Sequence, residues 1–137
     1  MLSLRKPSAD AIRCFLAAQA KLPFSDSAVG ATATTPPSGF VVDRPRIKLG
    51  IGESVFNVAT AALQRWEQFR LGWFKAWSPE TPIQSGEVVA VMGHAIGLWW
   101  LISCRIVSVV DESGPIRRVG FAYGTWRAMS RVVKNDC

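Results

Sequence analysis

The most regular hydrophobic pattern in the chain runs over residues 54–69. Apolar side chains recur there three or four residues apart, which is the spacing of one helix face. The stripe consists of Val55, Ala59, Ala62, Leu63, Trp66 and Phe69. Glu53 and Ser54 suit the first turn of such a helix, and Gly72 suits its end. We therefore predict one long amphipathic helix with a single buried face.

The segment before this helix is less regular. Residues 7–20 carry apolar side chains near helical spacing and predict an N-terminal helix with Pro7 or Ser8 at its start. Serine, threonine, alanine, glycine and proline dominate residues 25–39, which indicates an irregular surface connection. Residues 40–49 predict a strand at a sheet edge, because the proline within them has no N–H to donate.

The second half of the chain carries strand patterns. Residues 87–92, 98–110 and 116–123 are rich in β-branched and aromatic side chains, and turn residues separate them. Consecutive strands joined by short turns predict an antiparallel meander. The middle strand is apolar on both faces, so we expect it to be covered on both sides. The long helix can cover only one of them.

These elements predict an α+β fold in which an antiparallel β-meander packs on one long amphipathic helix, with an N-terminal helix added. The element order is similar to that of helix-grip lipid-binding domains, a comparison of architecture alone. The stretch over residues 88–104 has no Asp, Glu, Lys or Arg and approaches the length of a membrane-spanning helix. Gly93, His94 and Gly97 interrupt it, however, and its composition favours strands joined by a turn. We therefore expect no membrane span.

The last predicted strand has one face almost without side chains. Gly120 and Ala122 point to one side of it, whereas Phe121 and Tyr123 point to the other. Either a neighbouring aromatic side chain or a helix packs onto the empty side, or a cavity between the sheet and the helix admits an apolar small molecule. The candidate ligand-binding residues of such a cavity are Trp66, Trp73, Trp99, Arg105, Gly120, Ala122 and Tyr123.

Composition and charge narrow the choice of partners. The chain has 137 residues, of which 49% are hydrophobic, enough for one domain with a core of its own. Its formal net charge of +6 suggests an acidic partner. The basic residues are scattered, however, with Arg5-Lys6 and Arg117-Arg118 as the adjacent pairs, and they form no stripe interleaved with aromatics. Nucleic-acid binding is therefore not predicted.

The cysteines and the N-terminus bear on location. Three cysteines that lie far apart indicate neither a disulfide framework nor a Cys-x-x-Cys metal site, and they favour a reducing compartment. The apolar stretch near the N-terminus is short and broken by Arg13, so no cleaved secretory signal is expected. We therefore expect a soluble, cytoplasmic protein.

The inventory of reactive side chains is small. His94 is the single histidine, which argues against a multi-histidine metal site. Cys104 lies in an apolar strand and is expected to be a buried structural residue, while Asp111 and Glu112 suit a hairpin turn. The glycines on either side of Ile51 precede a helix, but they lack the spacing and the lysine of a phosphate loop. No catalytic residue, metal site or cofactor is therefore predicted.

Several segments of the chain resemble one known family. In chain order they are LPFS at 22–25, VGAT at 29–32, LGIGESVF at 49–56, AALQRW at 61–66, FRLGW at 69–73, CRIV at 104–107, VDE at 110–112 and GFAYGT at 120–125. These motifs are similar to those of uncharacterised protein family 0548, a domain-of-unknown-function family of bacteria and plants. The resemblance covers residues 4–125 and implies no established activity.

The resemblance ends after Thr125. There the family pattern continues with leucine, a glycine–histidine pair and a glycine–glutamate–glutamate run, whereas residues 126–137 show neither strand alternation nor a helical stripe. Codons for these residues can be chosen such that, when one lost base is restored, the shifted reading frame encodes the family pattern. We therefore interpret residues 1–125 as a single domain, and hypothesise that a frameshift replaced the native C-terminus with an atypical tail.

Two functions are compatible with these expectations. The first is a binding module that holds an apolar small molecule between sheet and helix. The second is an enzyme acting on a small molecule in the same cavity, with Arg105, His94 or Tyr123 as its polar groups. A cavity without a perturbed titratable group favours binding, whereas His94 or Asp111 facing into it favours catalysis.

Overall fold

The computed structural model describes the chain except for residues 25–27, 32–33, 36, 40, 42 and 126–137. The tail that the sequence attributes to a frameshift therefore lies outside the described residues. The elements are, in chain order, β1 (Leu2–Ser3), α1 (Ala9–Gln19), α2 (Glu53–Gln64), the 3₁₀ helix η2 (Glu67–Phe69), β2 (Phe74–Trp77), β3 (Val88–Ala95), β4 (Leu98–Ser113) and β5 (Arg117–Thr125).

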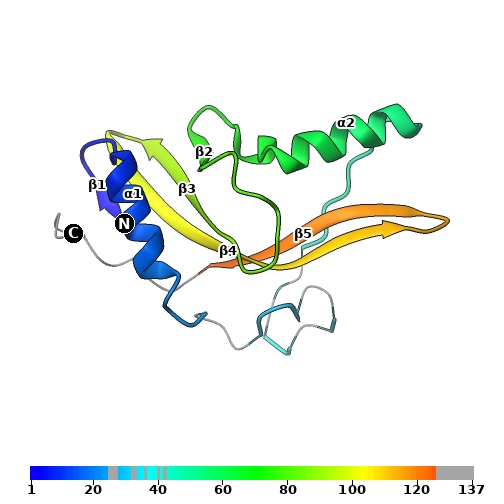
Figure 1. Cartoon of the computed structure of the whole chain (residues 1–137), viewed down its shortest axis with the longest axis horizontal. Coiled ribbons are helices and arrows are strands. Elements are labelled where there is room, and N and C mark those ends of the chain that lie inside the picture. Colours follow the sequence, from blue (N-terminus) through cyan, green and yellow to red (C-terminus); the bar gives the residue numbers. More distant parts are fainter. Residues whose placement is uncertain (25–27, 32–33, 36, 40, 42, 126–137) are drawn as a thin grey trace.

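One antiparallel sheet is built around the long strand β4 (Figure 1). β3 pairs along one edge of β4, whereas on the other edge β1 pairs near the start of β4 and β5 along its second half. β2 pairs with the outer edge of β3. The predicted α+β class and the antiparallel meander are confirmed.

The hairpin between β3 and β4 is tighter than the sequence suggests. A break was predicted over residues 93–97, but the two strands stay paired up to a two-residue turn at Ile96 and Gly97. Gly93 remains within β3 because its missing side chain leaves room for the indole of Trp100 on the opposite strand. The glycine thus serves ring packing and does not end the strand.

A β-bulge divides β4 into two parts. Ile106 lies opposite Tyr123 and Ser108 lies opposite Ala122, so Val107 is an extra residue on the β4 side. Beyond the bulge, β4 and β5 continue as a long two-stranded arm that extends away from the rest of the sheet (Figure 1).

Buried apolar residues lie on both faces of the sheet, because successive strand side chains point to opposite sides. On one face, α1 contributes Ile12 and Phe15 to a cluster completed by Ala90, Met92 and Leu101. On the other face, the cluster consists of Trp66, Val89, Val91, Cys104 and Ile106. The first half of β4 is therefore covered on both sides, as its two apolar faces predict.

The α1 helix forms at the predicted place. It begins after Ser8, whose hydroxyl accepts a hydrogen bond from the backbone N–H of Ala11 at 3.2 Å. Ahead of it, the chain adds a short strand that the sequence does not predict. The backbone N–H of Leu101 donates to the carbonyl of Met1 at 2.8 Å, which fixes β1 beside β4.

The long helix differs from the prediction over residues 54–69. α2 ends at Gln64, Trp66 adopts a left-handed conformation with φ 59° and ψ 27°, and η2 follows. α2 contains no buried residue, and Val58 on its apolar side is 69% exposed. The expectation that this helix packs on the sheet is therefore wrong for α2. The reversal of the backbone at Trp66 inserts that side chain into the sheet cluster, while the preceding turns run outward (Figure 1).

Two further expectations concern residues outside the sheet. The strand predicted over residues 40–49 is not formed, since the described part, 41 and 43–49, has no regular secondary structure. A proline inside a short extended segment removes one of the few N–H groups that could pair it to a neighbour. No helix within the described residues is both long enough and apolar enough to cross a membrane.

Candidate functional site

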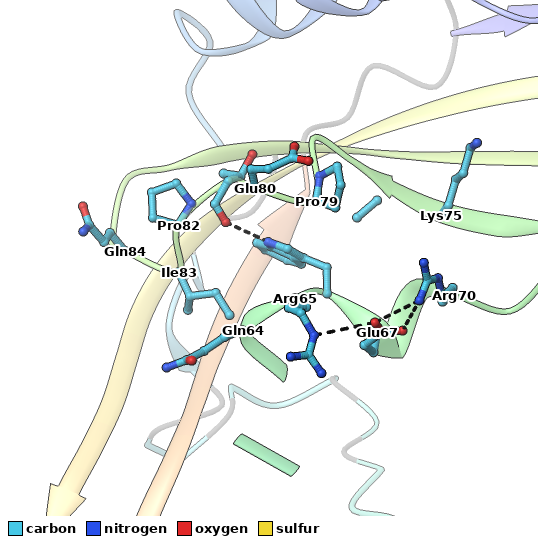
Figure 2. Close-up of a pocket in the computed structure, with 13 residues that line it drawn as sticks. Gln64, Arg65, Glu67, Arg70, Lys75, Pro79, Glu80, Pro82, Ile83 and Gln84 are labelled. Carbon is cyan, nitrogen blue, oxygen red and sulfur yellow. Dashed lines mark hydrogen bonds and ion pairs between the residues drawn. The ribbon is translucent and has the colours of Figure 1, made fainter. Parts of the chain in front are cut away.

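A pocket of about 720 Å³ lies between the end of α2, η2, the strand β2 and the loop that leaves β2. Figure 2 shows its walls. The lining residues are Gln64, Arg65, Trp66, Glu67, Arg70, Lys75, Ala76, Pro79, Glu80, Thr81, Pro82, Ile83 and Gln84. Apolar and charged side chains both contribute, so the pocket is amphipathic.

Trp66 is the fixed point of the apolar wall. Its side chain is 2% exposed, and the ring of Phe121 meets it edge-on at 5.1 Å between centroids. The indole Nε1–H donates to the backbone carbonyl of Thr81 at 2.8 Å, which ties the loop after β2 to the sheet cluster. A tryptophan with positive φ is uncommon and costs free energy, so its surroundings must hold it in place.

Charged side chains form the rim. The Glu67 carboxylate accepts hydrogen bonds from Arg70 Nη1 at 3.0 and 3.1 Å and lies 3.8 Å from Arg65 Nε. Figure 2 shows Glu67 between the two guanidinium groups. Glu80 accepts a hydrogen bond from the hydroxyl of Ser78, which holds the pKa of that carboxyl below its ordinary value. Both carboxylates of the pocket are thus already engaged within the protein.

Three of the sequence-predicted site residues lie on the Trp66 face or at its margin. Trp66 itself lines the pocket. Tyr123 does not, but its ring is 5.9 Å from that of Phe69, and burial together with the nearby Cys104 raises the pKa of its hydroxyl. Trp73 is 55% exposed and contacts the ring of Phe74 edge-on.

The other predicted site residues lie on the opposite face of the sheet. The ring of Trp99 stacks on that of His94 at 4.2 Å. Arg105 donates from Nη2 to the carbonyl of Ala20 at 2.5 Å and lies over the ring of Phe24. These side chains contact the α1 side of the sheet and are separated from the 720 Å³ pocket by the strands themselves.

The empty face of β5 is also on that side. Gly120, Ala122 and Gly124 alternate along the strand, and Gly124 pairs with Arg105. The ring of Phe24 fills the space over Gly124, where a Cβ atom would come within 3.0 Å of Phe24 Cε1. At this position a neighbouring aromatic side chain takes the vacated space. A Cβ atom on Gly120, in contrast, would meet no atom within 4 Å.

The remaining reactive side chains do not converge on the pocket. Burial raises the pKa of the Cys104 thiol to about 12, so this free cysteine is neutral in the sheet. Cys14 on α1 is disulfide-bonded, so the expectation that the separated cysteines form no disulfide is wrong for this residue. Asp111 and Glu112 lie in the exposed arm, where Glu112 pairs with Arg118 at 3.4 Å. Within the described ranges, no group of three or more potential metal ligands comes together.

Most of the pocket was not predicted from the sequence. In the sequence, Arg65 and Arg70 suit the negative end of a helix dipole, and Pro79 and Pro82 are typical of turns, so neither pair indicates a pocket. The sequence does contain one signal for this pocket, because a helix with basic residues at its end precedes a proline-rich turn. The left-handed residue that brings these segments together has no signature in the sequence.

A second, smaller hollow follows the exposed side of α2. It measures about 390 Å³ and is lined by Leu49, Ser54, Val55, Val58, Ala59 and Ala62. Across the helix from this hollow, the first turn of α2 meets the arm, where Arg117 lies 3.4 Å from Glu53 and over the ring of Phe56. Among the described residues that line it, none is charged, so the hollow differs from the mixed lining of the pocket at Trp66.

Comparisons with known proteins agree with the motifs in the sequence. A family described as a domain of unknown function, DUF1990, matches residues 25–128. A UPF0548 protein of Dictyostelium discoideum is 40% identical over 91 residues, and one of Arabidopsis thaliana is 28% identical over 89 residues. Each match covers 64% of this chain and 42% of the relative, so the matched part spans less than half of those proteins. No solved structure matches the chain.

Proposed function

The chain belongs to the family described as domain of unknown function DUF1990, and from this premise we propose that it is a binding module for an apolar small molecule. The ligand lies between the sheet and the segment formed by α2 and η2, as the sequence suggests. The observation that carries the proposal is the 720 Å³ pocket with the buried indole of Trp66 as its wall. Pockets that hold small molecules measure roughly 300–1,000 Å³.

The chemistry of the wall supports an apolar ligand. Ala76, Pro79, Pro82 and Ile83 line the pocket together with Trp66. These side chains offer hydrocarbon and ring surface, from which a ligand gains about 25 cal/mol for each Å² of apolar area removed from water. The hydrogen bond between Trp66 and Thr81 holds two of the walls together before any ligand binds, which reduces the ordering that binding requires.

The enzymatic alternative has less support. It requires a titratable group that is available to the ligand, and neither His94 nor Asp111 lines the pocket. The two carboxylates that do line it are already engaged, Glu67 by Arg70 and Glu80 by the Ser78 hydroxyl. Arg105 lies on the opposite face of the sheet, where it donates to Ala20. The hydroxyl of Tyr123 is kept neutral by its raised pKa and does not line the pocket either. Binding without chemistry is therefore the function that the arrangement favours.

Native mass spectrometry of gently purified protein tests the proposal. The expected result is a mass increment from a co-purifying apolar molecule. Ile83→Arg places a charged side chain in the apolar wall and should abolish the increment, whereas Ile116→Arg in the exposed turn of the arm is the matched control and should retain it. Since Ile83 also packs against the sheet cluster, Gln84→Trp at an exposed lining position provides a second, milder obstruction. An increment that persists in both pocket variants would contradict the proposal.

A further inference from the structure

We infer that the ligand of this pocket carries a single acidic group, and that Arg65 and Arg70 at the rim bind that group. The inference rests on the proposed binding function and specifies the class of ligand: an apolar body that ends in one anionic group. The charges of the rim, their existing partners and the position of the apolar wall lead to it.

The charges at the rim are not evenly distributed. Lys75 pairs with Met92, so its side chain points to the α1 face of the sheet and not to the rim. At Glu67, two guanidinium groups, Arg65 and Arg70, share one carboxylate. This leaves an excess of one positive charge, which an anionic ligand would neutralise.

The excess is concentrated at Glu67, which is shared by two guanidinium groups. Arg70 uses only Nη1 in its contact with the carboxylate, and Arg65 approaches it through Nε. In Figure 2 the terminal nitrogens of Arg65 are turned away from Glu67. A guanidinium has five N–H donors in a planar fork that suits a second carboxylate. Donors therefore remain at the rim for an incoming anion.

A cationic ligand does not fit the same rim. Glu67 is already paired with Arg70 and Arg65, and Glu80 is hydrogen-bonded by the Ser78 hydroxyl. An added cation would have to displace these partners and would meet the guanidinium groups of Arg65 and Arg70. A neutral ligand would bind the apolar wall but would leave the excess charge uncompensated. The anion is the ligand that uses both parts of the pocket.

The fold places the two binding surfaces, one for the apolar body of the ligand and one for its acidic group, close together. Arg65 and Glu67 flank Trp66 in the sequence, and the left-handed backbone of Trp66 turns its indole into the sheet cluster. The side chains of Arg65 and Arg70 are 66% and 77% exposed, so they can adjust to a bound group without disturbing the core. One short segment thus supplies both the wall and the charge.

A pair of fluorescent probes separates the two parts of the inference. N-phenyl-1-naphthylamine is neutral, and 8-anilinonaphthalene-1-sulfonate has the same aryl amine body with one sulfonate. We expect the sulfonate probe to bind about fivefold more tightly at low salt, as one exposed charge interaction allows. The advantage should decline as ionic strength rises, because solvent-exposed charges are screened.

Charge variants identify the residues responsible. Arg65→Gln and Arg70→Gln should each reduce the preference for the sulfonate probe while leaving the neutral probe unaffected. Arg118→Gln is the matched control, since Arg118 is also an exposed arginine paired with a glutamate, but on the arm. Val58→Asn in the hollow along α2 controls for probe binding at that second site. Circular dichroism checks that each variant is folded.

The possible outcomes separate this inference from the proposed function. If both probes bind equally and the arginine variants change nothing, the acidic ligand is excluded while the binding function stands. If neither probe binds to a folded protein, both fail. If the sulfonate preference disappears in Val58→Asn and not in Arg65→Gln or Arg70→Gln, the anion site is not at this rim. Loss of the preference in the two arginine variants alone is the result that supports the inference.

Discussion

The indole of Trp100 on β4 lies against the backbone of Gly93 on β3, in the space that a side chain on Gly93 would occupy. The two residues are direct partners across the strand pair. This contact explains why a glycine is found inside a strand, and it extends the hairpin to the tight turn that follows.

Gly93→Ala should therefore lower the free energy of unfolding by about 1–3 kcal/mol, because the added methyl group overlaps the Trp100 ring and forces a shift in a packed region. Urea denaturation measures the change. Gly114→Ala is the control, since a Cβ atom there would meet nothing within 4 Å, and it should stay within about 0.5 kcal/mol of the parent. Equal effects of the two substitutions would show that the ring contact is unimportant.

Trp66→Phe should destabilise the domain by about 1–2 kcal/mol, since it removes the hydrogen bond to the Thr81 carbonyl and part of the packing of a buried ring. Trp73→Phe, at a tryptophan that is 55% exposed, is the comparison and should change stability little. Both changes are measured by chemical denaturation. A larger effect at position 73 than at 66 would contradict the assignment of Trp66 as the anchor of the pocket wall.

Ile96→Asn should stabilise the domain by about 0.5–1 kcal/mol. Ile96 has φ 52° and is almost fully exposed in the two-residue turn before Gly97, so a β-branched side chain is strained there without gaining burial. Asparagine tolerates this conformation better. Ile116→Asn, in an exposed turn without positive φ, is the control. Thermal unfolding compares the two, and a lower melting temperature for Ile96→Asn would refute the strain argument.

The buried thiol of Cys104 predicts a dependence of stability on pH. Burial raises its pKa from about 8.5 in an unfolded chain to about 12 in the folded protein. The folded state then holds the proton more tightly, so this contribution is fully present below about pH 8.5 and is lost as the pH rises toward 12. Tyr123 acts in the same direction, because its pKa is raised too.

Two measurements examine this behaviour. The stability of the parent should fall between pH 9 and pH 11 more than that of Cys104→Val, in which the thiol is absent. Iodoacetamide should modify Cys104 in the folded protein on the order of a hundredfold more slowly than in urea, since the thiolate is the nucleophile. Rapid labelling of Cys104 under native conditions, followed by peptide mass spectrometry, would mean that the thiol is not buried as described.

The strands were largely predictable from the sequence, for a physical reason. Alternation and runs of β-branched residues reflect the two faces of β3 and β4, and these faces are buried against α1 and Trp66. The helix was less predictable. Its stripe of apolar residues has the correct spacing, but the spacing cannot reveal the left-handed turn at Trp66, which depends on contacts with residues distant in the sequence.

The candidate site was predictable only at Trp66. Trp99 and Arg105 both belong to the apolar strand β4. Their positions along the strand point both side chains to the α1 face, opposite the pocket. Which face of β4 meets α1 and which meets Trp66 is set by tertiary packing, which the sequence of the strand does not reveal. The tertiary fold brings the end of α2, η2 and the loop after β2 together, and the sequence alone does not show that Arg65 and Arg70 line a pocket there.

The most direct test of the binding pocket is an NMR titration with N-phenyl-1-naphthylamine, observing the indole N–H signals of ¹⁵N-tryptophan-labelled protein. The signal of Trp66 is assigned from its loss in Trp66→Phe. Trp66 lines the pocket, whereas Trp99 lies on the opposite face of the sheet. The account predicts a saturable shift of the Trp66 signal with little change at Trp99. An unchanged Trp66 signal at probe concentrations that shift the signal of Trp99 would contradict it.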